Sequence, residues 1–348
     1  MQKIILKNHQ SPGDVMMLTA AVRDLQKAHP GSYELKVDSS CSEIWENNPY
    51  ITDFPNGKAD RTIKCDYPLI HQSNDSPYHF IHGFRKHLED QLEVSIKQGP
   101  FKGDIHLTDA EKSWYSQPEE LGYKGKFWIL MAGGKFDFTA KWWNPNFHQE
   151  VVDHFKNKIV FVQCGEKAHF HPPLRGVIDL VGKTNLRQYI RLMHHAIGVV
   201  SPITFAMHLA PAVECRHNLL NRPAVVIAGG REPAQWEQYP HHRFLSLNGA
   251  LDCCDNGGCW KSRCTKVGDG DAKDNADLCI YPVKTDMQYT IRKSKKDIFV
   301  PKCMDMIKPS DVIRAIETYY EEESGVLTYE KLATQSRARA TLDKLLTK

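Results

Sequence analysis

Apolar and polar positions along the first hundred residues follow the rhythm of strands alternating with amphipathic helices. Lys3–Lys7 has the apolar run of a buried strand, and a turn at Ser11–Asp14 separates it from a helix predicted over Val15–Ala28. The further strands predicted here are Tyr33–Val37, Thr62–Cys65 and Tyr67–Ile70, and the further helices are Ser42–Asn47 and Tyr78–Leu92. This succession predicts an open, largely parallel sheet.

A second unit with the same rhythm follows a polar segment, residues 109–126, which we interpret as a link between domains. Its predicted strands are Phe127–Met131, Ile159–Gln163, Val177–Val181, Ile197–Val200 and Ala224–Ala228, and its predicted helices are Pro145–Phe155, Leu186–Ala196 and Thr204–Val213. We therefore predict an α/β protein with domains at residues 1–115 and 126–308, a helix at 309–323 and a polar tail at 324–348.

The regular pattern stops after Gly230, and residues 252–303 are rich in Cys, Gly and Asp. This segment has too few apolar runs to predict a hydrophobic core of its own. No stretch of 18 apolar residues predicts a membrane span, and the N-terminus lacks an apolar stretch of signal-peptide length, so we expect a cytoplasmic protein.

Six of the ten cysteines fall between residues 253 and 303. Because disulfides are rare in the cytoplasm, this density favours a tetrathiolate metal site over disulfides or free thiols. We expect structural zinc, with iron as the second choice, and no catalytic metal. The preferred ligands are Cys254, Cys259, Cys279 and Cys303, with Cys253 and Cys264 as substitutes.

The composition is that of an ordinary globular protein and does not point to a highly charged partner. Hydrophobic residues make up 41% of the chain and charged residues 25%, as in ordinary globular proteins with real cores. The 45 basic and 42 acidic side chains give a net charge of +3, which is too balanced to indicate a nucleic-acid or membrane partner by itself.

The turn after the first strand holds the first candidate for chemistry. Gly13 lets the backbone turn tightly, and Asp14 would lie at the carboxyl end of a strand, where open α/β sheets bind ligands. A carboxylate there could deprotonate an acceptor hydroxyl. The alternative is that Asp14 only caps the helix that follows.

Three further turns could bind an anion. Each follows a predicted strand, where glycines, cations or helix amides can approach phosphate oxygens. The candidates are Gly133, Gly134 and Lys141 in the first turn, Thr204, Phe205 and His208 in the second, and Gly230 and Arg231 in the third. The alternatives are a surface loop without a P-loop motif, a capped helix with a packed histidine, and an Arg231–Glu232 surface pair.

Taken in order, these residues resemble glycosyltransferase family 9, the ADP-heptose:lipopolysaccharide heptosyltransferases and their relatives. The residues that carry the resemblance are Gly13-Asp14, Lys141-Trp142, Gln163-Cys164-Gly165-Glu166 and Thr204–His208. It spans most of residues 1–320 and implies the GT-B architecture, in which two Rossmann-like domains face a cleft and a C-terminal helix returns to the first. The cysteine segment is similar in idea to the iron finger of autotransporter heptosyltransferases, which glycosylate proteins, although its spacing differs.

The resemblance implies an inverting transfer of a heptose or hexose from a nucleotide-diphosphate sugar, with an ADP-sugar favoured. Asp14 would be the base, Lys141 would bind phosphate, and Glu166 would lie near the nucleoside. The family's Asp-Thr-Gly-x-x-His motif falls on residues 203–208, where Ile203 and Phe205 depart from it. The acceptor would be a hydroxyl of a glycan, a protein or another polymer, and an oligomer is possible.

Two other classes of function compete with this one. A sugar-nucleotide epimerase or dehydrogenase is disfavoured, because no GxGxxG motif follows the first strand. A non-catalytic module that binds a nucleotide sugar, a protein or DNA, with a structural metal site, is the main alternative.

Overall fold

The first half of the chain folds around a small parallel sheet in the order β2-β1-β3. The computed structural model describes residues 1–66, 69, 72–321, 327–329 and 336–346, so the predicted strand Tyr67–Ile70 falls mostly outside it. The strands are β1 (Gln2–Asn8), β2 (Tyr33–Ser39) and β3 (Arg61–Lys64), and the helices are α1 (Pro12–Ala28) and α2 (Phe80–Leu92), with short 3-10 turns at Ser42–Ile44 and Asn56–Lys58.

The second half contains a six-stranded sheet in the order β6-β5-β4-β7-β8-β9, with every neighbouring pair parallel. Its strands are β4 (Phe127–Leu130), β5 (Val160–Gln163), β6 (Ile178–Asp179), β7 (Gly198–Pro202), β8 (Ala224–Gly229) and β9 (His242–Ser246). The segment interpreted as a plain link instead contains α3 (Asp109–Ser113) and α4 (Gln117–Glu120), each begun by a capping box.

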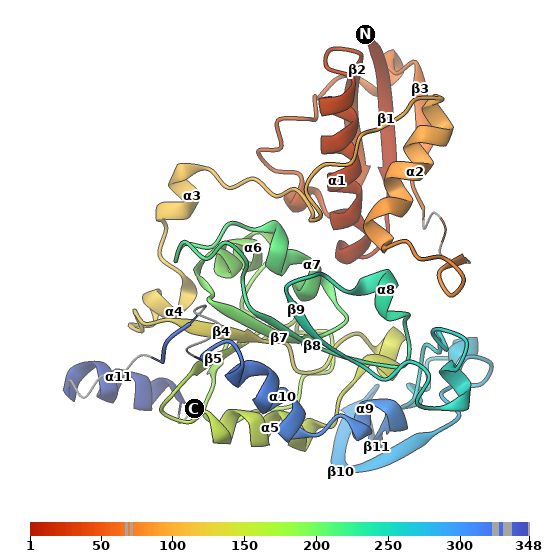
Figure 1. Cartoon of the computed structure of the whole chain (residues 1–348). Coiled ribbons are helices and arrows are strands. Elements are labelled where there is room, and N and C mark those ends of the chain that lie inside the picture. The colour runs from red at the N-terminus through yellow and green to blue at the C-terminus, as the bar shows by residue number, and fades with distance from the viewer. Residues whose placement is uncertain (67–68, 70–71, 322–326, 330–335, 347–348) are drawn as a thin grey trace.

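Helices cover both faces of this larger sheet. Figure 1 shows α6 (Leu186–His195) and α7 (Phe205–Ala212) on the face toward the N-terminal half, and α5 (Pro145–His154) and α10 (Pro309–Glu317) on the other face. The remaining helices are α8 (Ala234–Glu237), α9 (Lys302–Met306) and α11 (Ser336–Leu346), with a 3-10 turn at Phe136–Lys141. No helix in the described ranges combines the length and the apolar character that crossing a bilayer requires.

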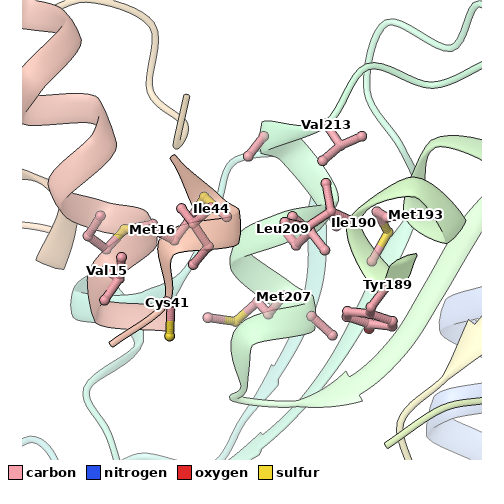
Figure 2. Packing of buried hydrophobic residues seen from close by; sticks show 14 of the residues in the cluster. Val15, Met16, Cys41, Ile44, Tyr189, Ile190, Met193, Met207, Leu209 and Val213 are labelled. Atoms are coloured by element: carbon pink, nitrogen blue, oxygen red, sulfur yellow. The ribbon is translucent and has the colours of Figure 1, made fainter. Parts of the chain in front are cut away.

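The two halves share one hydrophobic core. Val15 and Met16 of α1 pack with Met207 and Leu209 of α7, and Ile190 of α6 lies in the same buried cluster (Figure 2). The side chains of α1 are buried continuously from Asp14 to Leu25, because this helix packs against both α2 and α7. Burial of this apolar surface holds the halves together and positions the first turn of α1 beside the first turn of α7.

The cysteine-rich segment contains strands that the sequence analysis does not predict. Its second part forms an antiparallel hairpin of β10 (Pro282–Ile291) and β11 (Ser294–Pro301). Ile291, Ile298 and Val300 of this hairpin pack against Trp142 and Phe170 as a separate buried cluster. The apolar positions of β10 recur every second residue, which is the period of a strand, and the abundance of Cys, Gly and Asp before it masked this signal.

The helix predicted at residues 309–323 does not return to the N-terminal half, so that part of the prediction is wrong. Its described part, α10, packs on α5, β8 and β9 of the larger sheet. Val312 and Ile316 are buried against Trp128, Val225 and Ile227. An amphipathic helix needs one apolar surface to cover, and the free face of the larger sheet supplies it.

Candidate active site

A cavity of about 810 Å³ lies between the two halves, and most of the predicted site residues line it. The first turn of α1 closes it from the N-terminal half, while the ends of β4, β5, β7 and β8 supply the other walls. The predicted residues in its lining are Gly13, Asp14, Gly133, Gly134, Lys141, Glu166, Thr204, Phe205, His208 and Arg231. Chain segments up to about 200 residues apart thus meet at the carboxyl ends of parallel strands, where open α/β folds bind ligands.

Among the described residues, Asp14 is one of two carboxylates that the N-terminal half contributes to the cavity lining, and Glu43 is the other. The helix begins at Pro12 rather than at Val15, so Ser11 is the N-cap and Asp14 stands three residues after it. The N–H of Ser11 donates to Asp14 Oδ2 over 3.1 Å, and Asp14 is only 6% exposed. The alternative of Asp14 as the N-cap itself is therefore corrected. Its carboxylate reaches back to the N-cap backbone, as in a capping box, and still lines the cavity.

A predicted glycine pair has a different local role from the one expected. Gly133 has φ of +102°, and a Cβ at this position would lie 2.1 Å from the carbonyl oxygen of Phe170. The N–H of Gly134 donates to that same oxygen over 2.9 Å. The glycines therefore let the chain around Phe170 pack closely against the cavity wall, and the amide of Gly134 is already used.

Two cations and one buried carboxylate form the polar centre of the cavity. Lys141 Nζ lies 2.8 Å from Glu232 Oε1, and the guanidinium of Arg231 pairs with the same oxygen. Burial raises the pKa of Glu232, but Lys141 and Arg231 lower it by more, so the net pKa lies below its ordinary value. Glu232 is thus an anion that holds both cations at the cavity.

The first turn of α7 adds groups that can bind an anion. Lys141 Nζ also donates to the carbonyl of Ile203 over 3.2 Å, which places the ammonium at the start of this helix. Thr204 is the N-cap, and its Oγ1 is buried without a hydrogen-bond partner among the described residues. The helix N-terminus, an unused hydroxyl and Lys141 therefore converge, a combination suited to phosphate oxygens.

His208 and Glu237 form a buried pair on the cavity floor. His208 Nε2 lies 3.4 Å from Glu237 Oε2, and its Nδ1 hydrogen-bonds Tyr239 Oη at 3.1 Å. Burial lowers the pKa of His208 well below its usual value, with His79, Lys141 and His242 adding to the effect. Burial raises the pKa of Glu237 well above its usual value, and the charge of Glu232 raises it further. Burial therefore favours the neutral form of both groups.

Glu166 lies at the outer edge of the same cavity. Its side chain is 68% exposed and pairs with His169 at 3.3 Å. Asn185 and Tyr189, from the start of α6, line the cavity as well. Glu166 is therefore accessible to a ligand that extends from the cations toward α6.

Several cavity residues escaped the sequence analysis. Lys135 donates from Nζ to Ser11 Oγ over 2.9 Å and so joins the halves beside Asp14. Glu232, Glu237 and Trp260 are the other main additions to the lining. The sequence shows the Arg231–Glu232 pair and suggests a surface pair as the alternative to a ligand site, whereas both residues are buried.

Gly230 belongs to the cysteine cluster and does not line the cavity. A Cβ at residue 230 would lie 2.7 Å from Cys254 Sγ, and the Gly230 N–H donates to the sulfur of Cys303. Burial raises the pKa of Cys303 to about 11, with smaller contributions from Cys259, Cys279 and Cys254. The four preferred cysteines therefore lie close enough to influence one another's ionisation.

The cysteines lie near one another, but among the described residues no three of their sulfur atoms are as close together as metal ligands would be. Four sulfurs bound tetrahedrally at about 2.3 Å from an ion would lie about 3.8 Å apart. In the described part of the chain, one group of three His, Cys, Asp or Glu ligand atoms lies within 4.8 Å, namely Asp137, Asp269 and Asp271. Arg263, fully buried, pairs with Asp269 at 2.7 Å and with Asp137 at 3.6 Å, which accounts for this acidic group without an ion.

Known proteins share this fold. The family model of glycosyltransferase family 9 (heptosyltransferase) matches residues 71–248, just over half of the chain. No curated protein matches it by sequence. The iron-containing dodecameric glycosyltransferase TibC of enterotoxigenic Escherichia coli is similar at 18% identity and a TM-score of 0.58, over 93% of this chain and 80% of TibC.

Two other solved structures resemble the chain. A family 9 glycosyl transferase from Veillonella parvula has 15% identity and a TM-score of 0.53, over 71% of this chain and 85% of its own. ADP-heptose lipopolysaccharide heptosyltransferase II of Escherichia coli has 13% identity and a TM-score of 0.50, over 91% of this chain and 98% of its own. Together with the parallel sheets, these likenesses confirm the predicted α/β fold of the GT-B type.

Proposed function

Since this chain belongs to glycosyltransferase family 9 and moves a sugar from a nucleotide donor, we propose that it is an inverting enzyme that uses an ADP-sugar. The observation that carries the proposal is the meeting of Asp14 with Lys141 and Arg231 in one cavity. A base from the N-terminal half thus faces cations from the C-terminal half. Family membership favours this enzyme over the alternative of a non-catalytic binding module.

In the proposed reaction, Asp14 takes the proton of an acceptor hydroxyl. The acceptor oxygen then forms a bond to the anomeric carbon as the bond from that carbon to the β-phosphate oxygen breaks, which inverts the configuration. Lys141, Arg231 and the amides at the start of α7 stabilise the charge on the departing diphosphate. Glu232 keeps the two cations aimed at the cavity before the donor arrives.

The proposal assigns the acceptor and the donor to different halves of the protein. The acceptor binds mainly to residues 1–115, which supply Asp14, and the donor binds to residues 126–308. The nucleoside extends toward Glu166, which is exposed, and the start of α6. The acceptor is a hydroxyl of a glycan, a protein or another polymer, and the sugar is a heptose or a hexose.

ADP is the favoured nucleotide because TibC has been solved with ADP-D-β-D-heptose. The test is a thermal-shift series with ADP, GDP, UDP, CDP and dTDP, followed by measurement of ADP release from ADP-heptose. We expect ADP to raise the melting temperature most, since a ligand that binds only the folded state stabilises it. If none of the five nucleotides raises the melting temperature, the proposal fails.

We also propose that the cysteine cluster holds a structural zinc or iron ion. Main-chain N–H groups of Gly230, Lys261 and Tyr281 donate to the sulfurs of Cys303, Cys259 and Cys279, as they do around metal-bound thiolates. Burial still raises the pKa of Cys303 and Cys259, whereas the pKa of Cys279 is lowered to about 7, so a bound cation would have to stabilise the first two thiolates. The iron in TibC supports a metal here, as its dodecameric state supports an oligomer. The ion would hold the loop in place and take no part in the transfer.

A further inference from the structure

The cysteine-rich segment reaches the cavity through a short stretch, Gly258–Lys261. The N–H of Cys259 donates to Gly230 O over 3.3 Å, and the N–H of Trp260 donates to Arg231 O over 2.9 Å. Trp260 has φ of +55°, a left-handed conformation that is uncommon for a bulky residue and turns its indole into the cavity lining. One stretch of chain therefore connects a cysteine to the cavity wall.

The same stretch holds Arg231 in place. Arg231 Nε donates to the carbonyl of Lys261 over 2.6 Å. The guanidinium lies 5.4 Å from the centre of the Trp260 ring and 5.2 Å from that of Phe138, within the range of cation–π attraction. Because Arg231 is 6% exposed and has few directions left to move, a shift of Trp260 would shift the guanidinium.

A single residue of the N-terminal half holds this stretch from across the cleft. Asn74, in the loop before α2, donates from Nδ2 to Gly258 O over 3.0 Å. Its Oδ1 accepts from Gly258 N over 3.1 Å and from Trp260 Nε1 over 3.0 Å. Gly257 leaves room for this, since a Cβ there would lie 2.8 Å from Asn74 Cγ. Gly258 O, Gly258 N and Trp260 Nε1 thus all bind the same side chain of the N-terminal half.

We propose that Asn74 is a positioning residue for sugar transfer, which ties Trp260, and through it Arg231, to the half of the protein that carries Asp14. This inference rests on the proposed function. The hydrogen bonds of Asn74 set the distance between the wall that carries Asp14 and the wall that carries Arg231. They also join the cysteine-rich segment to the N-terminal half. The cations keep their own partners without Asn74, so the donor still binds, but its anomeric carbon is no longer aligned with the acceptor oxygen.

The test compares Asn74→Ala and Asn74→Asp with the wild-type protein. Each is measured for ADP release from ADP-heptose, for ADP affinity by calorimetry and for melting temperature. For Asn74→Ala we expect kcat to fall by roughly 10- to 100-fold, since a misplacement of about 1 Å can cost 10²-fold. KM and the Kd of ADP should change by less than about 3-fold, because Lys141 is untouched and Arg231 keeps its ion pair with Glu232 when its guanidinium shifts. Asn74→Asp keeps both accepting contacts and should recover part of kcat.

A matched control is Gln235→Ala. Gln235 joins α8 to the same loop through two long bonds, 3.3 Å to Ser73 O and 3.5 Å to Ser76 O, and it is exposed. Its loss should change kcat by less than about 2-fold, because long hydrogen bonds from an exposed side chain contribute little. An equal loss of kcat in Gln235→Ala would show that general loosening of the seam is the cause and would overturn the role of Asn74.

A double-mutant cycle identifies the route. Trp260→Phe keeps an aromatic face for Arg231 and removes the indole N–H that Asn74 accepts. If Asn74 acts through Trp260, the losses in kcat of Asn74→Ala and Trp260→Phe should not add in the double variant. Additive losses would overturn this route, and so would an Asn74→Ala protein that melts lower yet keeps full kcat. A wild-type protein that neither binds ADP nor releases it from ADP-heptose would overturn the proposed function first, and this inference with it.

Discussion

Gly13 of α1 lies directly against His208 of α7, so that a Cβ on residue 13 would come within 3.2 Å of His208 Cδ2. The two residues belong to opposite halves of the protein, and both line the cavity. His208 is held by Tyr239 and lies beside Glu237, so it has little freedom to move away. The close approach of the two halves beside Asp14 therefore depends on the absence of a side chain at residue 13.

Gly13→Ala should consequently weaken transfer without unfolding the protein. Alanine stabilises a helix relative to glycine by roughly 0.5–1 kcal/mol, and the contact with His208 offsets this gain. We expect a melting temperature within about 3 °C of the wild type and ADP release from ADP-heptose slower by roughly 10-fold, because the halves are pushed apart. Gly57→Ala is the control, since a Cβ there meets nothing within 4 Å. Full activity in Gly13→Ala would show that this contact is dispensable.

Asp14→Asn should separate catalysis from helix capping. The amide oxygen can still accept from the N–H of Ser11, so stability and ADP affinity should stay near those of the wild type. Loss of the carboxylate should lower the transfer rate by roughly 10²- to 10⁴-fold, the range for a general base. Asp14→Ala should lose the rate and also about 1 kcal/mol of stability, because the N–H of Ser11 loses its acceptor. Initial rates and melting curves of the three proteins decide the matter, and a fully active Asn variant would exclude Asp14 as the base.

Much of this site could be predicted from the sequence because its parts are local. Asp14, Lys141, Thr204 and His208 each follow a strand that the apolar pattern identifies, and parallel strands bring their carboxyl ends to one edge. The start of α1 was predicted three residues too late, at Val15, although Ser11, Pro12 and Asp14 have the spacing of a capping box with proline in the first turn.

The rest depends on contacts between distant segments. Glu232 looks like half of a surface pair in the sequence, and only the packing of Trp260 and Phe138 around Arg231 buries it. The amphipathic pattern of α10 shows that one face is buried, but it carries no information about which half of the protein covers that face. Asn74 has no sequence signal at all, because its two partners, Gly258 and Trp260, lie more than 180 residues away.

Glu237→Gln should make the protein more stable at high pH. Burial raises the pKa of Glu237 above its ordinary value of 4.5, so the folded protein keeps a proton that the unfolded chain releases above that pH. The wild type therefore loses stability as the pH rises from about 4.5 toward the folded pKa, whereas glutamine has no proton to lose. Melting temperatures should agree near pH 4 and differ by at least about 2 °C at pH 8, or roughly 1 kcal/mol.

The control for this pH effect is Glu150→Gln, a change at an exposed glutamate of α5. Its melting temperature should follow that of the wild type at every pH, since an exposed carboxylate is solvated in both states. A difference between Glu237→Gln and the wild type that is constant from pH 4 to pH 8 would contradict the assignment of a protonated Glu237. It would point to a packing effect of the amide instead.

Cys279→Ser should remove the structural metal and loosen the cysteine segment. The thiol of Cys279 receives a hydrogen bond from Cys264, which lowers the pKa of Cys279 and favours the thiolate that a metal ion requires. We expect about one equivalent of zinc or iron in the reduced wild type and well under half of that in the variant, as one of four ligands is lost.

Cys164→Ala is the control, since Cys164 is buried beside the larger sheet outside the cluster. Elemental analysis without chelators, paired with limited proteolysis of residues 252–303, checks both effects. Equal metal content in wild type and Cys279→Ser would exclude this thiol as a ligand, and a metal-free wild type would exclude the site.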